Sequence, residues 1–161
     1  MNREQYWNPL VPELTVSDVE TSLSFYAAVG FTVRFRRTEP EFVYIKLGDA
    51  QLMLEQEHAS DWNVAPLDRP FGRGINFQIE VPIAFDVAER LNQAGYCLYR
   101  EPKESWYSVS ESQEEGQIEL LAQDPDGYLM RIVQILESRE ATPNLAFERD
   151  APKAARPSTL R

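Results

Sequence analysis

The sequence of 161 residues predicts an α+β fold built from two tandem βαβββ modules, whose strands form a curved, mixed sheet. Apolar and polar residues alternate with the period of a β-strand in eight short segments, and two longer segments show helical period. A glycine, Gly30 or Gly95, follows each predicted helix. Residues 59–74 lack periodicity and contain prolines and glycines, which is typical of a linker between the two halves.

The first module is predicted over residues 10–58. In its first strand Leu14 and Val16 alternate with Glu13, and Asp18 then provides a side chain that can cap a helix. We expect its elements in this order: a strand over 10–16, a helix from Ser17-Asp18 to Gly30, and strands over 31–36, 42–47 and 51–55.

The second module, predicted over residues 75–136, repeats this order. We expect a strand over 75–81, a helix over 83–94, and strands over 96–100, 117–123 and 128–135. The last two strands flank the turn Asp124-Pro125-Asp126-Gly127, in which proline fixes φ and glycine supplies a positive φ. Because one helix covers only one face of a four-stranded sheet, the other faces are expected to form a trough for a small ligand.

The formal net charge of −10 limits the partners. Residues 137–161 carry five basic and four acidic residues, so the other 136 residues hold 11 basic and 22 acidic ones, a net charge of −11. Binding to nucleic acid through phosphate neutralisation is therefore disfavoured, and so is docking on an anionic membrane. An acidic surface can attract a cationic ligand, although it can equally serve only solubility.

Cysteine and histidine are equally scarce. The single cysteine, Cys97, excludes an intramolecular disulfide and is expected to be a small buried residue, while the single histidine, His58, is expected to be exposed and incidental. The first residues lack the apolar region of a signal peptide, and no apolar run reaches the ~18 residues of a membrane span, so a cytoplasmic protein is expected. Residues 1–9 are expected to form an extension, and residues 137–161, which include Leu145-Ala146-Phe147, a mobile end or an arm that packs on the body.

Several short motifs occur in a fixed order. They are Pro12-Glu13-Leu14-Thr15-Val16-Ser17-Asp18, Ser24-Phe25-Tyr26, Gly30-Phe31 and Asp124-Pro125-Asp126-Gly127-Tyr128. In these motifs and their spacing the chain resembles the vicinal oxygen chelate superfamily, which includes glyoxalase I, extradiol dioxygenases, and fosfomycin and bleomycin resistance proteins. The resemblance covers about residues 10–134 and implies paired modules that form a trough.

The resemblance also implies metal-ligand positions on the first and last strand of each module, where enzymes of this family hold His or Glu. In this chain the positions fall at Val11, Met53, Asn76 and Arg131. Val11 has no donor atom, and Met53 is a soft thioether. Asn76 offers only a neutral amide oxygen, and Arg131 is a permanent cation that repels a metal ion. We therefore expect no metal, no cofactor and no catalytic residue.

Without these ligands the chain looks most like the metal-free bleomycin resistance proteins. The shared features are Phe25-Tyr26, the region of Trp106 before a β-hairpin, and the segment from Asp124 to Arg131. This resemblance implies a homodimer that sequesters a small molecule, such as a bleomycin-type drug, in grooves at the subunit interface and performs no chemistry. It leaves open whether the modules pair within one chain or between chains.

Candidate ligand-binding residues of the first module lie on the sheet face opposite its helix. Phe42 and Tyr44 share that face, where aromatic rings can stack on a planar ligand. Met53 is expected to face the same trough, and Trp62 in the linker can form a wall. Each of the four can instead pack in the core or anchor a loop, and these alternatives stay open.

The remaining candidates involve the second module. Asn76 and Gln78 belong to a polar row that can orient a ligand or simply face solvent. Trp106, in an irregular segment before the last hairpin, can wall the trough or anchor that segment. Glu13 and Arg131 are expected to face the same centre, where they can bind ligand groups of opposite charge or pair with each other.

Three functions compete at this point. The sequence favours a dimeric binding protein that holds an aromatic or cationic antibiotic-type molecule. The second is a glyoxalase- or dioxygenase-type metal enzyme with a relocated site that uses Glu13, Glu55 or His58. The third is a regulatory or immunity protein whose partner is another protein.

Overall fold

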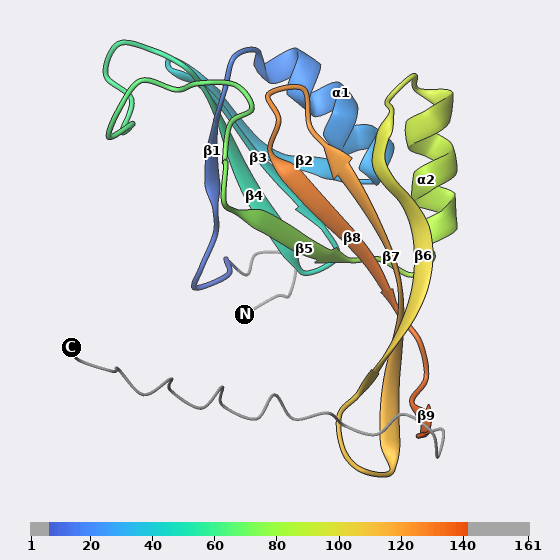
Figure 1. Cartoon of the computed structure of the whole chain (residues 1–161). Helices are drawn as coiled ribbons and strands as arrows, with labels where there is room; N and C mark the ends of the chain where they lie inside the picture. Colours follow the sequence, from blue (N-terminus) through green and yellow to red (C-terminus); the bar gives the residue numbers. More distant parts are fainter. Residues whose placement is uncertain (1–6, 142–161) are drawn as a thin grey trace, which may run out of the picture.

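The computed structural model describes residues 7–141, which form two βαβββ modules (Figure 1). The first module consists of β1 (Glu13–Val16), α1 (Val19–Val29), β2 (Thr32–Thr38), β3 (Glu41–Leu47) and β4 (Ala50–Gln56). The second consists of β5 (Asn76–Glu80), α2 (Ala84–Gln93), β6 (Leu98–Ser108), β7 (Gln113–Gln123) and β8 (Leu129–Ile135), and a short strand β9 (Arg139–Glu140) follows.

Each module forms its own mixed sheet. The strand orders are β1-β4-β3-β2 and β5-β8-β7-β6, and β9 pairs with β7. In both sheets the first strand of the module runs parallel to the last, and the other neighbours are antiparallel. The predicted α+β fold of two repeated βαβββ modules is confirmed.

Helix α1 begins and ends where the sequence indicates. The side chain of Asp18 accepts a hydrogen bond of 2.7 Å from the backbone N–H of Thr21, which satisfies one of the free donors of the first turn. Gly30 ends the helix at a φ of 121°, a conformation that a residue with a Cβ rarely adopts.

The hairpin of β6 and β7 is longer than predicted. The sequence indicated strands over 96–100 and 117–123, whereas the hairpin reaches Ser108 and returns from Gln113, beyond the end of β8 (Figure 1). Residues 113–116 of β7 pair with β6 or β9 but not with β8. The outer part of the hairpin is mostly polar and packs on no helix, so no alternation of apolar residues marks it.

The core lies on the helix side of both sheets. In the first sheet Leu14 and Val16 on β1, and Val43 on β3, point toward α1 and are at most 3% exposed. Residues of both sheets and both helices form one continuous apolar cluster, which includes Leu91 on α2 and Ile132 on β8. The predicted alternation is therefore confirmed for these strands. The opposite face of each sheet lies outside this core.

The turn between β7 and β8 carries a buried carboxyl group that contacts the first module. Asp124 is 4% exposed. Its Oδ1 accepts hydrogen bonds of 2.8–3.0 Å from the backbone N–H groups of Asp126, Gly127 and Tyr128. Its Oδ2 accepts a hydrogen bond of 3.1 Å from the hydroxyl of Tyr26 on α1.

A second carboxyl group of the same turn binds the end of β1. Asp126, 1% exposed, accepts hydrogen bonds from the backbone N–H (2.9 Å) and the hydroxyl (2.7 Å) of Ser17. The guanidinium of Arg69 lies 2.6 Å from the same carboxylate, and the hydroxyl of Tyr128 donates to the carbonyl of Thr15 at 3.0 Å. The turn of the second module thereby fixes the first strand of the first.

Two expectations change with the structure. Cys97, which lies between α2 and β6, is exposed and not buried. Within the tail, Arg139 and Glu140 pair with β7, while Leu145-Ala146-Phe147 lies outside the described residues. Within residues 7–141 neither helix has the length and apolar character needed to cross a membrane.

The stability of the fold should depend on whether the carboxyl group of Asp124 is protonated. Burial raises the pKa of Asp124 from 3.8 to about 6, so the folded protein binds this proton more tightly than the unfolded chain. The resulting stabilisation is complete below 3.8 and is lost as the pH rises through about 6. We predict that this group lowers the free energy of unfolding by about 2 kcal/mol as the pH rises from 4 to 7.

Urea denaturation of the wild type and of Asp124→Asn at several pH values checks this. The variant keeps an oxygen acceptor for the turn but cannot titrate, so the difference between the two proteins should follow the pH as stated. Parallel stability curves for the two proteins would contradict the role of Asp124.

Candidate functional site

A pocket of about 380 Å³ opens on the outer face of the first sheet, the face turned away from α1. All four strands of the first module and the segment after β4 contribute to it. It is lined by Glu13, Arg37, Pro40, Phe42, Met53, Glu55, His58, Ser60 and Trp62.

The strand register explains why these side chains share one face. Glu13 on β1 is paired with Met53 on the parallel strand β4, and Glu55 lies two residues further along β4. The antiparallel pairing of β3 with β4 then places Phe42 opposite Glu55. Leu54, which lies between Met53 and Glu55, is fully buried on the other face.

Arg37 reaches the pocket because β2 contains an irregularity. The register with β3 shifts between Val33 and Phe35, and such a shift moves the following side chains to the other face. Arg37 is then paired with Phe42, and its guanidinium lies 4.9 Å from the centre of the Phe42 ring. Simple alternation contains no sign of this shift, so the sequence did not identify Arg37.

The charged groups of the pocket centre on Glu55. The guanidinium of Arg37 lies 3.3 Å from its carboxylate, and Nε2 of His58 lies 3.6 Å from the same oxygen. Glu13 on the neighbouring strand β1 lines the same pocket as Glu55. Burial raises the pKa of Glu13 above its ordinary value of 4.5, the neighbouring Glu55 raises it further, and Arg37 opposes the shift.

Aromatic and thioether groups form the apolar walls. Phe42 is only 9% exposed and forms the floor, whereas Trp62 is 89% exposed at the rim. A ligand that covers Trp62 therefore removes a large apolar surface from water. Met53 is half-buried between the two acidic side chains and can adapt to different shapes.

Four of the residues predicted from the sequence meet at this pocket: Glu13, Phe42, Met53 and Trp62. His58 also lines it and its side chain is 26% exposed, so the expectation of an exposed histidine is wrong. The sequence considered Glu55 only as a metal ligand, although its alternation with Leu54 already places it on the face of Met53. Nothing in the sequence singles out Ser60.

Tyr44 shares the outer face but lies outside the pocket. It is 1% exposed because Trp7 packs edge-on against it, with ring centres 4.5 Å apart. Its hydroxyl donates to Gln51, and Arg34 lies over the rings of both aromatic residues. Tyr44 therefore supports the segment before β1.

The predicted residues of the second module lie on a separate, polar surface. Asn76 and Gln78 are exposed on the outer face of β5, as the alternation predicted. Arg131 donates to Gln78, and its Nε lies 3.4 Å from Glu119 on β7. Glu13 and Arg131 thus do not pair with each other, and the described pocket contains no residue of the second module.

Trp106 anchors the extended hairpin. Its ring lies against Gly116 on β7, and the guanidinium of Arg139 stacks on it at 3.8 Å. The indole N–H donates to Glu104 at 2.6 Å. This arrangement matches the alternative interpretation of Trp106 as an anchor for its segment.

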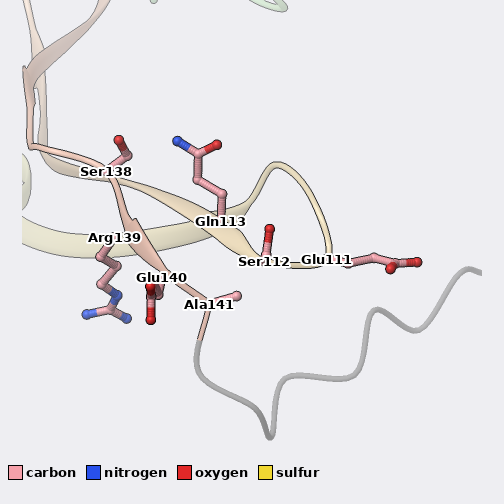
Figure 2. A pocket seen from close by; sticks show the side chains of 7 residues that line it. All are labelled: Glu111, Ser112, Gln113, Ser138, Arg139, Glu140 and Ala141. Atoms are coloured by element: carbon pink, nitrogen blue, oxygen red, sulfur yellow. The ribbon is translucent and has the colours of Figure 1, made fainter.

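A larger hollow of about 790 Å³ lies at the tip of the hairpin, between residues 111–113 and 138–141. Figure 2 shows that its side chains do not converge: Gln113 and Ser138 point to one side, Arg139 to the other, and Glu111 away from both. This hollow therefore lacks the convergent polar groups of a binding site.

The donor set does not fit the metal centre that the resemblance implies. Met53 faces the pocket of the first module, while Asn76 and Arg131 lie on the second sheet, where Arg131 is held by Glu119. A guanidinium in such a position repels a cation. Within residues 7–141, no three His, Cys, Asp or Glu side chains form a group that could hold a metal ion.

Comparisons with known proteins agree with this architecture. A family model described as Glyoxalase/Bleomycin resistance protein/Dioxygenase superfamily matches residues 9–132. The search of curated proteins gives no match.

Solved structures of other proteins have a similar fold. A protein from the mobile metagenome of V. pseudocholerae is 18% identical with a TM-score of 0.60, covering 83% of this chain and 98% of that one. A virulence protein from Salmonella typhimurium is 21% identical with a TM-score of 0.59, covering 81% and 98%. A bleomycin-binding protein in complex with bleomycin is 20% identical with a TM-score of 0.52, covering 80% and 98%.

The role of Trp106 can be tested through Gly116. A Cβ at Gly116 would lie 2.7 Å from the Trp106 ring, so Gly116→Ala must displace the ring and its stacking with Arg139. We predict a loss of about 1–3 kcal/mol in the free energy of unfolding, measured by urea denaturation. Glu115→Ala, at an exposed neighbouring position, should change it little. Equal stability of both variants and the wild type would contradict this packing.

Proposed function

Because the chain belongs to the glyoxalase/bleomycin resistance protein/dioxygenase superfamily, we propose that it is a binding protein that sequesters a small molecule in the pocket of its first module. The ligand is an aromatic or cationic molecule of the antibiotic type, such as a bleomycin-type drug, and it is held without metal chemistry. The observation that carries the proposal is the pocket itself, which Phe42 and Trp62 line together with Glu13.

The chemistry of the pocket favours binding over conversion. Phe42 and Trp62 offer flat apolar surfaces, and Glu13 offers a carboxyl group without an ion-pair partner among residues 7–141. Stacking and charge recognition together suit a flat molecule with a positive group.

We further propose that the protein acts as a homodimer. Ligand pockets of drug-sized molecules have volumes of roughly 300–1,000 Å³, so a pocket of about 380 Å³ accommodates only part of a large antibiotic. A second wall is therefore needed, and the polar outer face of the second sheet, with Asn76, Gln78 and Arg131, is available in a partner subunit. A cytoplasmic location fits the free, exposed thiol of Cys97.

The alternative is a metal enzyme with a relocated site. It draws support from the meeting of Glu13, Glu55 and His58 at one pocket. The ion pair of Glu55 with Arg37 opposes it, because a guanidinium next to the carboxylate competes with a metal ion. Elemental analysis of the purified protein decides between the binding protein and the metal enzyme. A stoichiometric metal that is lost in His58→Ala would establish the metal enzyme.

Calorimetry with a bleomycin-type glycopeptide tests the binding function. We predict binding that weakens about tenfold or more in Trp62→Ala, because this ring would be covered by the ligand. The ring is 89% exposed in the free protein, so its removal should leave the stability unchanged. Tyr99→Ala, which removes an aromatic ring that is 66% exposed on the second module, serves as the matched control.

The outcomes separate the parts of the proposal. Equal binding by the wild type and Trp62→Ala would show that the ligand binds at another surface. Absence of heat with the glycopeptide would contradict a bleomycin-type ligand.

A further inference from the structure

A serine, a histidine and a glutamate form a chain of contacts in the pocket of the first module. Glu55 belongs to β4, and His58 and Ser60 belong to the segment that follows it. The hydroxyl oxygen of Ser60 lies 3.1 Å from Nδ1 of His58, and Nε2 of His58 lies 3.6 Å from the carboxylate of Glu55. In a catalytic triad the same three groups occur in this order, because the carboxylate orients the imidazole and the imidazole takes the proton of the hydroxyl.

The hydrogen bonds of His58 determine which ring nitrogen carries the proton. The backbone N–H of Ser60 donates to Nδ1 at 3.2 Å, so Nδ1 presents its lone pair to Ser60. In a neutral imidazole the hydrogen then belongs to Nε2. Nε2 is buried and makes no hydrogen bond within residues 7–141, so the carboxylate of Glu55 at 3.6 Å is the group that can stabilise a proton there. Contacts between catalytic groups are often this long before a substrate binds.

The segment after β4 is held in shape by its own hydrogen bonds. The backbone N–H of Asp61 donates to the carbonyl of His58 at 3.2 Å, and the carboxylate of Asp61 accepts from the backbone N–H of His58 at 3.3 Å. The hydroxyl of Thr15 on β1 donates to the side-chain oxygen of Asn63 at 3.2 Å, which connects the segment to the sheet. The hydroxyl of Ser60 and the imidazole are therefore positioned before a ligand arrives, as a nucleophile and its base must be.

The other side chains of the pocket suit an aromatic ester. Ser60 is exposed, so its hydroxyl is open to a ligand. Phe42 and Trp62 line the same cavity and can stack on an aryl group. Arg37 brings a guanidinium, which has further N–H groups besides the one that lies against Glu55. Such donors stabilise the negative charge that develops on a carbonyl oxygen during acyl transfer.

We propose that the pocket also hydrolyses aryl esters of small carboxylic acids, with Ser60 as the nucleophile, His58 as the base and Glu55 as a positioning residue. The hydroxyl oxygen of Ser60 forms a bond to the carbonyl carbon, and its proton passes to Nδ1 of His58. The bond from that carbon to the leaving oxygen breaks, and the leaving oxygen takes the proton. Water then attacks the acyl group on Ser60 and gives a proton to His58, which returns it to the Ser60 oxygen as the acid departs.

This activity goes beyond the binding function proposed above and does not depend on it. A ligand without a reactive carbonyl group is only bound, whereas an ester that reaches Ser60 is also cleaved. The reaction and the binding of a drug are therefore measured in separate experiments.

A fluorophosphonate probe and p-nitrophenyl acetate test this reaction. An activated serine takes the phosphonyl group of the probe with loss of fluoride, so mass spectrometry of the digested protein identifies the modified residue. We expect the label on Ser60, and we expect hydrolysis of p-nitrophenyl acetate that is lost in Ser60→Ala. Ser138→Ala removes an exposed serine that lines the hollow at the tip of the hairpin, and it should keep the wild-type rate.

Two further variants assign the roles of His58 and Glu55. His58→Ala should slow the labelling of Ser60 about 100-fold or more, and added imidazole should restore part of the rate because it replaces the missing base. Glu55→Gln should also slow the labelling, since an amide does not stabilise an imidazolium as a carboxylate does. The double variant should be no slower than His58→Ala, because Glu55 acts only through His58.

The inference is overturned if the probe leaves Ser60 unlabelled, if it labels Ser138 equally well, or if Ser60→Ala hydrolyses the ester as fast as the wild type. The last result would assign the reaction to the imidazole of His58 itself. Labelling of His58→Ala at the wild-type rate would also contradict the proposed base. In each case the binding function stands, because calorimetry with the glycopeptide tests it independently.

Discussion

The two modules depend on the turn between β7 and β8, because that turn buries carboxyl groups that accept hydrogen bonds from Tyr26 and Ser17 of the first module. A buried carboxylate that loses a hydrogen-bond donor destabilises a protein strongly, since no water replaces the donor. Asp124 therefore requires both the folded shape of its own turn and the hydroxyl of Tyr26 on α1. Arg90 on α2 adds a second link, because its guanidinium donates to the carbonyls of Ala28 and Val29 at the end of α1.

The contacts between this turn and the first module also set the position of the candidate site. Asp126 binds the backbone of Ser17 directly after β1, and Tyr128 binds the carbonyl of Thr15 within β1. Glu13 lies on the same short strand, so its place beside β4 is held from the second module. The shared core on the helix side of both sheets leaves the outer faces free, and the two faces differ: the first carries an aromatic, acidic pocket, and the second carries ion pairs around Glu119.

Most of the fold could be predicted from the sequence because its signals are local. The caps of α1, the alternation of Leu14 and Val16, and the turn that ends in Gly127 each depend on residues a few positions apart. The predictions failed where contacts between residues far apart in the sequence determine the structure. The outer half of the β6–β7 hairpin is stabilised by Arg139 stacking on Trp106, a contact between residues 33 positions apart, and no local pattern predicts it.

For the candidate site, the sequence by itself determined which residues of β1, β3 and β4 share a face, because side chains of a strand alternate strictly. It thereby identified Glu13, Phe42 and Met53. Only the tertiary structure decided that Arg37 joins them, since a shift of register in β2 turns its side chain over. Only the tertiary structure likewise showed that Arg131 and Glu13 do not meet. Strand alternation tells which face of its own sheet each side chain occupies, but the packing of the two sheets decides which faces meet.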